Sequence, residues 1–325
     1  MRNAGKRIPE YLLTLLIIIT LNFFIPRMMP GDPFTFVSSE ENSSSAVYSK
    51  TEIIRLKEYY GLDRSLPEQY ARYLLCTLRG DFGYSIYYHD TVLRLVGGRV
   101  VYTLPIALTA LILSCAIGCV LGCISAYRRN GGFDKVAYAV ITVFSQIPAF
   151  LVGVFFLFFF AGKFGWFPLS GAMKVFATYE TPLNRVRDIL HHAFLPILTL
   201  TLANLGEFYL LSRNSMISVL SKEYMTTAKA KGLHKWRVLF VHALKNAILP
   251  IITRFCMSLG TVFSGAVLVE NVFQYPGLGT LMRQAIVVRD YTLIQGIFLF
   301  FAATVLLMNM LADIIYRRLD PRVAV

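Results

Sequence analysis

The sequence predicts an all-α integral membrane protein with six transmembrane helices. Hydrophobic residues make up 56% and charged residues only 16% of the 325 residues, whereas about a quarter of a soluble domain is charged. Six apolar segments each reach the roughly 20 residues that a helix needs to cross a bilayer. The net charge of +13 comes mainly from lysines and arginines in short segments between the apolar ones. That pattern is typical of the inner face of a membrane protein and argues against nucleic-acid binding.

The six expected spans follow one another along the whole chain. We place them at residues 8–28, 101–127, 136–160, 194–211, 247–269 and 293–316. The first could pass for a secretory signal peptide, but Pro26 and Arg27 follow its apolar run in place of a cleavage site with small residues. We therefore expect it to be retained as a span.

Basic residues set the predicted orientation. They cluster before the first span, between the second and third, between the fourth and fifth, and after the sixth. All four places fall on one side of a six-span protein, so both termini are expected inside. The predicted domains are a cytoplasmic N-terminus with the first span (1–29), an extracytoplasmic loop subdomain (30–99), a transmembrane core (100–316) and a cytoplasmic tail (317–325).

Two short helices are expected in the extracytoplasmic subdomain. Residues 49–60 place Ile53, Ile54 and Leu56 at helical spacing with charges between them, and Gly61 can end that helix. Residues 66–78 form a second helix, which Pro67 opens.

Neither the cysteines nor the adjacent histidines indicate a metal site. Cys115, Cys119 and Cys123 recur at helical spacing inside one apolar run, where free thiols act as small hydrophobic side chains. His191 and His192 lie outside the fourth expected span and would point apart on a helix or strand, with no third ligand near in sequence. We expect them to be a solvated or interfacial pair.

The segment between the fourth and fifth spans is the most informative part of the chain. From Glu223 to Arg237 it is too basic to enter the bilayer, and it consists of good helix formers up to Lys231. Gly232 can then end the helix and turn the chain, and small residues at 226–228 would let a partner approach closely. This composition favours a helix that docks on a partner. An ordinary solvated basic loop, or an interfacial helix on anionic lipid, is the alternative.

Several motifs in this segment and elsewhere recur together in a known family. They are TAKAKGL at 227–233 with VHALKNAILP at 241–250, MPGDP at 29–33, GLD at 61–63 with Gln69 and Tyr70, GDFGYS at 80–85, ENVFQYPGLG at 270–279, RDY at 289–291 and DPR at 320–322. The chain resembles ABC importer permeases nearly end to end. More narrowly, it resembles the first of the two permease subunits in the dipeptide, oligopeptide and nickel permease family.

The resemblance implies a transport subunit and not an enzyme. It implies alternating access by a heterodimer with a second homologous permease, driven by two ATPase subunits or domains and supplied by an extracytoplasmic solute-binding protein. The chain holds no Gly-x-x-x-x-Gly-Lys-Ser/Thr phosphate loop. ATP and magnesium are therefore expected on the ATPases, and no cofactor is expected on this chain. The implied location is the cytoplasmic membrane of a prokaryote.

The resemblance also assigns contact with the ATPases to the segment from 226 to 233, which comprises Thr226, Thr227, Ala228, Lys229, Ala230, Lys231, Gly232 and Leu233. The general ABC coupling motif begins Glu-Ala-Ala, whereas this chain has Thr-Thr-Ala at the matching positions. An ion pair to the ATPase from that acidic position is therefore not carried over.

Three acidic and basic residues in or near the spans are further candidates. Glu207 lies in the fourth expected span and Arg254 in the fifth, at similar depth in antiparallel helices. Charges at membrane depth are costly, so we expect these two to form an ion pair that ties the helices together. The alternative is that one or both face the substrate path. By the resemblance, Glu270 at the outer end of the fifth span occupies a position close to a gate.

Three other functions compete with peptide import. A nickel or metal-chelate permease shares the motifs, and calorimetry of the cognate binding protein with peptides and with nickel complexes would separate the two. A membrane-embedded enzyme would need a nucleophile, an acid–base pair or a metal cluster at membrane depth, and Glu207, Arg254 and scattered hydroxyl side chains do not make one. A passive channel would transport without ATP.

Overall fold

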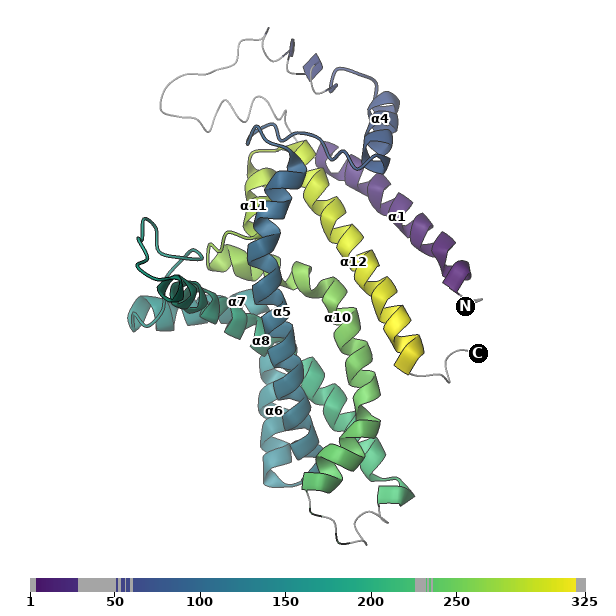
Figure 1. The fold of residues 1–325 in the computed structure, drawn as a ribbon, viewed down its shortest axis with the longest axis vertical. Helices are drawn as coiled ribbons and strands as arrows, with labels where there is room; N and C mark the ends of the chain where they lie inside the picture. Colours follow the sequence, from purple (N-terminus) through teal and green to yellow (C-terminus); the bar gives the residue numbers. More distant parts are fainter. Residues whose placement is uncertain are drawn as a thin grey trace. The chain divides into compact units, whose positions relative to one another are not determined.

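The regular structure of the described chain is helical, apart from one bridge between Tyr84 and Thr91. The computed structural model describes residues 4–28, 51, 54–55, 57–58, 61–225, 232, 234 and 236–319. Its helices (Figure 1) are α1 (Ala4–Arg27), α4 (Leu66–Leu78), α5 (Val92–Tyr127), α6 (Gly132–Ser145), α7 (Ala149–Phe156), η1 (Leu157–Lys163), α8 (Pro182–Leu220), η2 (Arg237–Ala243), α10 (Leu244–Val272), α11 (Leu278–Val287) and α12 (Tyr291–Leu319).

The predicted all-α membrane class is confirmed. Five helical stretches of the described chain are long and apolar enough to cross a membrane, and the bent pair formed by 132–145 and 149–163 makes a sixth if it counts as one span. Helix α4 has the bounds that the sequence predicted. The predicted helix at 49–60 lies mostly outside the described residues, and the inside position of both termini stays a prediction.

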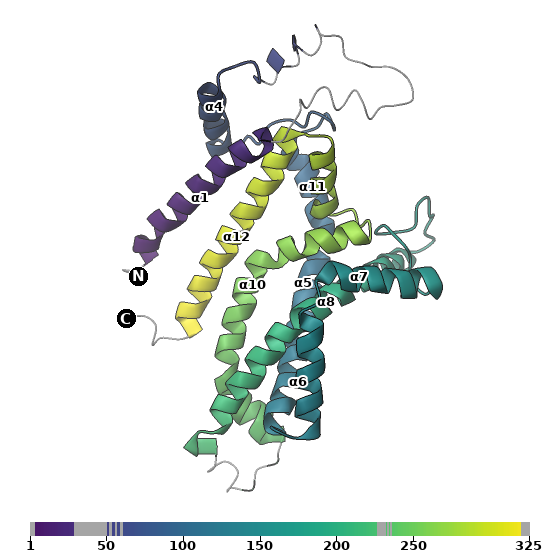
Figure 2. The same ribbon diagram turned by 180° about the vertical axis from the view of Figure 1, so that it is seen from behind.

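The third expected span, 136–160, is not one continuous helix. Helix α6 ends at Ser145 and α7 begins at Ala149, with an angle of 96° between the two parts of the chain; Figure 2 shows α7 leaving the direction of α6. Pro148 precedes α7 with φ −54° and ψ 135°. Proline has no backbone N–H and disfavours the helical region for the residue before it, and both effects favour a break at this point.

Helix α8 extends far beyond the fourth expected span, 194–211. It begins at Pro182, directly after Thr181, whose side chain accepts a hydrogen bond from the Asn184 backbone N at 3.3 Å. A threonine cap followed by proline at the first helical position is a favourable helix start. His191 and His192 therefore lie within this helix, before the residues of the fourth expected span.

The described residues form two compact units. The first draws on 1–101 and 277–306, and the second on 102–276 and 307–325. Helices α5 and α12 contribute to both. The predicted domain boundaries divide the chain differently and stay predictions.

In the first unit, α4 packs on α1 through aromatic and polar side chains. Phe23 is fully buried, and its ring lies 5.3 Å from that of Tyr70 and 5.6 Å from that of Tyr73. A hydrogen bond of 2.8 Å joins Thr20 to the Tyr70 hydroxyl, and Asn22 Nδ2 donates to the Tyr73 hydroxyl at 3.1 Å.

In the second unit, α5 and α8 approach closely because α5 carries two glycines one turn apart. A Cβ atom on Gly118 would lie 2.8 Å from Phe208 Cβ, and one on Gly122 would lie 2.7 Å from the Tyr209 backbone oxygen. This Gly-x-x-x-Gly spacing is a common way for membrane helices to pack. The sequence contains it plainly, yet our sequence analysis did not use it.

Candidate functional site

Both ends of the loop between α8 and η2 are fixed in one buried hydrophobic cluster, which we call the loop-root cluster. Met225 before the loop is 0% exposed, and Val238 and Leu239 after it are 2% and 3% exposed. They pack with side chains from several helix ends, namely Cys123 and Ala126 of α5, Met216 and Val219 of α8, Ala243 of η2 and Ala247 of α10. A displacement of the loop would therefore reach α5, α8 and α10.

Most of the predicted coupling residues, 226–231 and 233, lie outside the described residues. Gly232 is described and is exposed, with φ at +70°. No atom lies within 4 Å of the place that a Cβ atom would take. Glycine is needed there for the backbone conformation and not for space. Contact of 226–233 with an ATPase stays a prediction.

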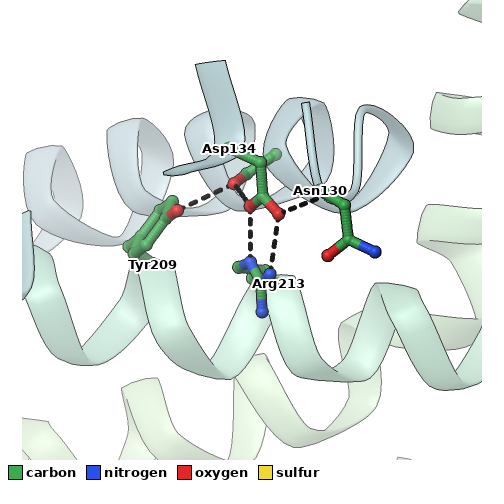
Figure 3. A network of polar contacts seen from close by, with 5 residues as sticks. Asn130, Asp134, Tyr209 and Arg213 are labelled. Carbon is green, nitrogen blue, oxygen red and sulfur yellow. Dashed lines mark hydrogen bonds and ion pairs between the residues drawn. The ribbon is translucent and has the colours of Figure 1, made fainter. Parts of the chain in front are cut away.

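A buried polar network ties the turn between α5 and α6 to α8 (Figure 3). Asp134 is 2% exposed and accepts hydrogen bonds from Arg213 Nε at 2.7 Å, from Arg213 Nη2 at 2.8 Å and from the Asn130 backbone N at 3.0 Å. Ser125 Oγ donates to the same carboxylate and shares a 2.8 Å hydrogen bond with the Tyr209 hydroxyl. A two-pronged arginine–carboxylate contact fixes orientation as well as distance.

We did not predict this network from the sequence. Asp134 stands in a segment that we read only for its basic residues, and Arg213 stands just past the expected end of the fourth span. An acidic residue and an arginine near the ends of two spans were a usable signal. Their separation of 79 residues along the chain gives no indication that they meet.

Glu207 and Arg254 lie together as an ion pair between α8 and α10, as their predicted depths suggested. Oε1 of the glutamate faces Nε of the arginine, while the two side chains remain 45% and 40% exposed. Both side chains are therefore partly open on one face of the second unit, although the Arg254 Nε atom itself is covered. The function of the pair stays a prediction.

Glu270 is fully buried near the end of α10. Its backbone oxygen accepts a hydrogen bond from Tyr275 N at 2.8 Å. Burial, with a smaller contribution from the Glu270 carboxylate, raises the pKa of Tyr275 to about 12. The Phe273 oxygen accepts from Gly171 N at 3.2 Å, which joins the end of α10 to the loop after η1. The position of Glu270 near a gate stays a prediction.

Two of the sequence motifs meet in the first unit. Asp290 of RDY is 1% exposed and accepts hydrogen bonds from Ser85 Oγ of GDFGYS at 2.5 Å and from Tyr87 N at 3.1 Å. It also accepts from Leu293 N at 3.0 Å and so caps the start of α12. Burial raises the pKa of the Asp290 carboxyl, although these hydrogen bonds oppose the shift. The hydrogen bonds of Asp290 therefore join the segment after GDFGYS to the start of α12.

Gln69 holds the GLD motif in place through hydrogen bonds to its backbone and to the residue after it. Its Nε2 donates to the backbone oxygens of Leu62 at 3.3 Å and Arg64 at 2.8 Å. Its Oε1 accepts from Nε and Nη2 of Arg27 at 3.2 and 3.1 Å. Gly61, with φ at +67°, begins this turn, so one side chain connects the turn, α4 and α1.

The adjacent histidines point apart, as expected. His192 is buried and its Nδ1 donates to the Asp188 oxygen at 2.8 Å, so the expectation of a solvated pair was wrong for it. His191 is exposed and hydrogen-bonds the Trp166 oxygen at 2.9 Å. Within the described residues, no group of three or more histidine, cysteine or acidic side chains is placed to hold a metal ion. All five cysteines are free thiols.

Several helices long and apolar enough to cross a membrane, and a loop whose two ends lie in one buried cluster of helix ends, are compatible with the membrane subunit of a transporter. The family described as the binding-protein-dependent transport system inner membrane component matches residues 118–325. The chain belongs to that family and is an ABC importer permease, which confirms the resemblance found in the sequence.

Two related permeases can be aligned with nearly the whole chain. It is 33% identical over 301 residues to a protein named "probable peptide ABC transporter permease protein" of Sinorhizobium fredii, covering 93% of this chain and 92% of that one. It is 31% identical over 318 residues to the glutathione transport system permease protein of Shigella flexneri, with 98% and 97% covered. A solved structure described as inward-facing conformations of the MetNI methionine ABC transporter shares the fold, with a TM-score of 0.54 at 16% identity over 70% of this chain and 97% of that one.

Proposed function

We propose that this subunit imports peptides across the cytoplasmic membrane of a prokaryote by alternating access, in a heterodimer with a second homologous permease. Relatives named for peptides and for glutathione, itself a tripeptide, match almost the full length of the chain. A separate extracytoplasmic binding protein delivers the peptide. Two ATPase subunits or domains bind ATP and magnesium and act on residues 226–233.

The loop-root cluster is the observation that supports this mechanism. Because Met225, Val238 and Leu239 share a close-packed core with the ends of α5, α8 and α10, a force on the loop moves those helix ends together. A loop with free ends would bend instead. Coupling of this kind requires a physical element that both partners act on, and the loop with its buried root is that element.

ATP-dependent uptake tests the proposal. The chain is purified in complex with the second permease, the ATPases and the binding protein that assemble with it, and is reconstituted in liposomes. We expect uptake of a radiolabelled dipeptide, or of radiolabelled glutathione, only with both ATP and the binding protein. Uptake that ignores ATP would contradict the mechanism. A binding protein that binds nickel complexes and no peptide in calorimetry would contradict the choice of solute.

A further inference from the structure

The Glu207–Arg254 pair lies in an unusual place for two charges. Glu207 stands roughly 20 Å along α8 from Leu220, by the 1.5 Å rise per residue, and both partners belong to stretches that are long and apolar enough to cross a membrane. Each charge neutralises the other, yet the side chains stay 45% and 40% exposed. Something other than this chain's own core therefore covers them.

Polar side chains lie close to the pair, although Met257, one turn after Arg254, is apolar and 46% exposed and Ser258 is buried. Asn204 lies one turn before Glu207 on α8, and Ser258 and Thr261 follow Arg254 on α10. Asn204, Ser258 and Thr261 also line a small cavity of about 40 Å³, together with Leu200, Gly265 and the α5 residues Ala107 and Leu111; it is large enough for a water molecule. The exposed side of α5 in its span is different, since Ile112, Ile117 and Val120 are 42–54% exposed there.

The exposed apolar side chains of α5 are compatible with contact to lipid, whereas the exposed charges of α8 and α10 are not. A charge facing hydrocarbon costs several kcal/mol, and polar side chains in spans usually face protein or water. A second protein chain packed against the pair would have to bury both charges, which also carries a desolvation cost of several kcal/mol per ion. Water leaves both charges solvated and the pair intact.

We propose that this face of α8 and α10 lines the water-filled transport path, and that the Glu207–Arg254 pair meets the charged ends of a passing peptide. Glu207 receives the ammonium end and Arg254 the carboxylate end. Arginine carries five N–H donors and a carboxylate about four acceptor sites, so each keeps capacity for a ligand beyond the contact with its partner. The inference rests on the proposed function and names the substrate contacts within it.

Cysteine labelling tests the aqueous position without disturbing the charges. Thr261→Cys places a thiol on the proposed path, and Ile117→Cys places one on the apolar side of α5 as a matched control. The reconstituted wild-type complex, with its native thiols, sets the background for a charged, membrane-impermeant methanethiosulfonate reagent. We expect labelling of Thr261→Cys alone, slowed by excess dipeptide. Labelling at the wild-type level, or equal labelling of both variants, overturns the inference.

A charge series then separates substrate contact from a purely structural pair. We expect Glu207→Gln and Arg254→Gln to lower dipeptide uptake by about tenfold, a change that corresponds to one lost polar contact. The exchange Glu207→Arg with Arg254→Glu keeps an ion pair, so it should restore thermal stability but not uptake. Uptake within about twofold of wild type in the exchanged protein would show that the pair only ties the helices. If the wild-type complex imports neither dipeptide nor glutathione, the proposed function is wrong. The cysteine labelling still shows whether this face of α8 and α10 is accessible to water.

Discussion

Asp134 shows how one buried carboxylate can fix the position of two helices. It receives both prongs of Arg213 from α8 and the backbone N–H of Asn130 from its own turn. All of its partners are donors, so the ionised form is well satisfied although the residue is 2% exposed. Removing one member of such a pair leaves the other charge buried without compensation.

We therefore expect Asp134→Ala to lower the free energy of unfolding by at most about 3–5 kcal/mol, because Arg213, whose side chain is only 16% exposed, is then left without its counter-charge. Asp134→Ala combined with Arg213→Met should regain most of that loss, since an apolar pair needs no partner. Thermal unfolding of the detergent-solubilised complex measures both. A double variant less stable than Asp134→Ala would contradict this account.

Asp290 provides a prediction about pH. Burial raises the pKa of its carboxyl, so the protonated form is favoured in the folded protein. Its stabilising effect is fully present below the unfolded pKa near 4 and is lost as pH rises through the higher folded value. Asp290→Asn keeps the shape without titrating, so its unfolding midpoint should gain on that of wild type between pH 4 and 8. Parallel midpoint curves for the two proteins would show that the carboxyl does not titrate differently on folding.

At the scale of the helices, two features determine the arrangement. One is the close approach of α5 to α8, and the other is the break between α6 and α7. Gly118 and Gly122 let α5 touch the backbone of α8, and Pro148 prevents the third expected span from continuing straight. Both effects arise from backbone sterics and not from hydrophobicity, which is why apolar runs alone did not reveal them.

Gly122→Ala tests the α5–α8 contact. Alanine is the better helix former by about 1 kcal/mol, yet its Cβ would come within 2.7 Å of the Tyr209 oxygen, so we expect a net loss of about 1–3 kcal/mol from overpacking. Gly98→Ala is the matched control in the same helix, because no atom lies within 4 Å of its Cβ position. It should be neutral or slightly stabilising in the same thermal unfolding measurement. Equal effects of the two substitutions would rule out steric contact as the cause.

At the scale of the whole molecule, the loop-root cluster connects the predicted ATPase-contact segment to three helices. Gly232, inside that segment, has φ at +70° and open space around it. A substitution there acts on the shape of the loop without disturbing the core. It can therefore separate ATP hydrolysis from transport.

We expect Gly232→Val to reduce ATP-dependent uptake by about tenfold, because a β-branched residue is strained at positive φ by 1–2 kcal/mol or more. Gly232→Asn should retain most of the uptake, since asparagine tolerates this conformation. ATP hydrolysis by the complex is measured in parallel and should continue in both. Equal uptake by the Val and Asn variants would show that the backbone conformation at 232 does not matter.

Particular residues show how far sequence reasoning extends. The start of α4 followed from Pro67, and the ion pair of Glu207 with Arg254 followed from their depth in antiparallel spans. The early start of α8 had a readable signal in Thr181 and Pro182 that we did not use. For Asp134 and Arg213 the sequence showed two charged residues near span ends, but not that they meet, because pairing across 79 residues depends on how the helices pack.

The sequence by itself determined the membrane class, the number of apolar runs, the family motifs and the absence of a phosphate loop, since these depend on composition and local order along the chain. The tertiary structure alone decided that GDFGYS meets RDY through Ser85 and Asp290, and that the charged pair of α8 and α10 stays open on one face. These facts depend on side-chain packing between distant segments. Hydrophobic periodicity indicates which segments are apolar but not which neighbours they meet.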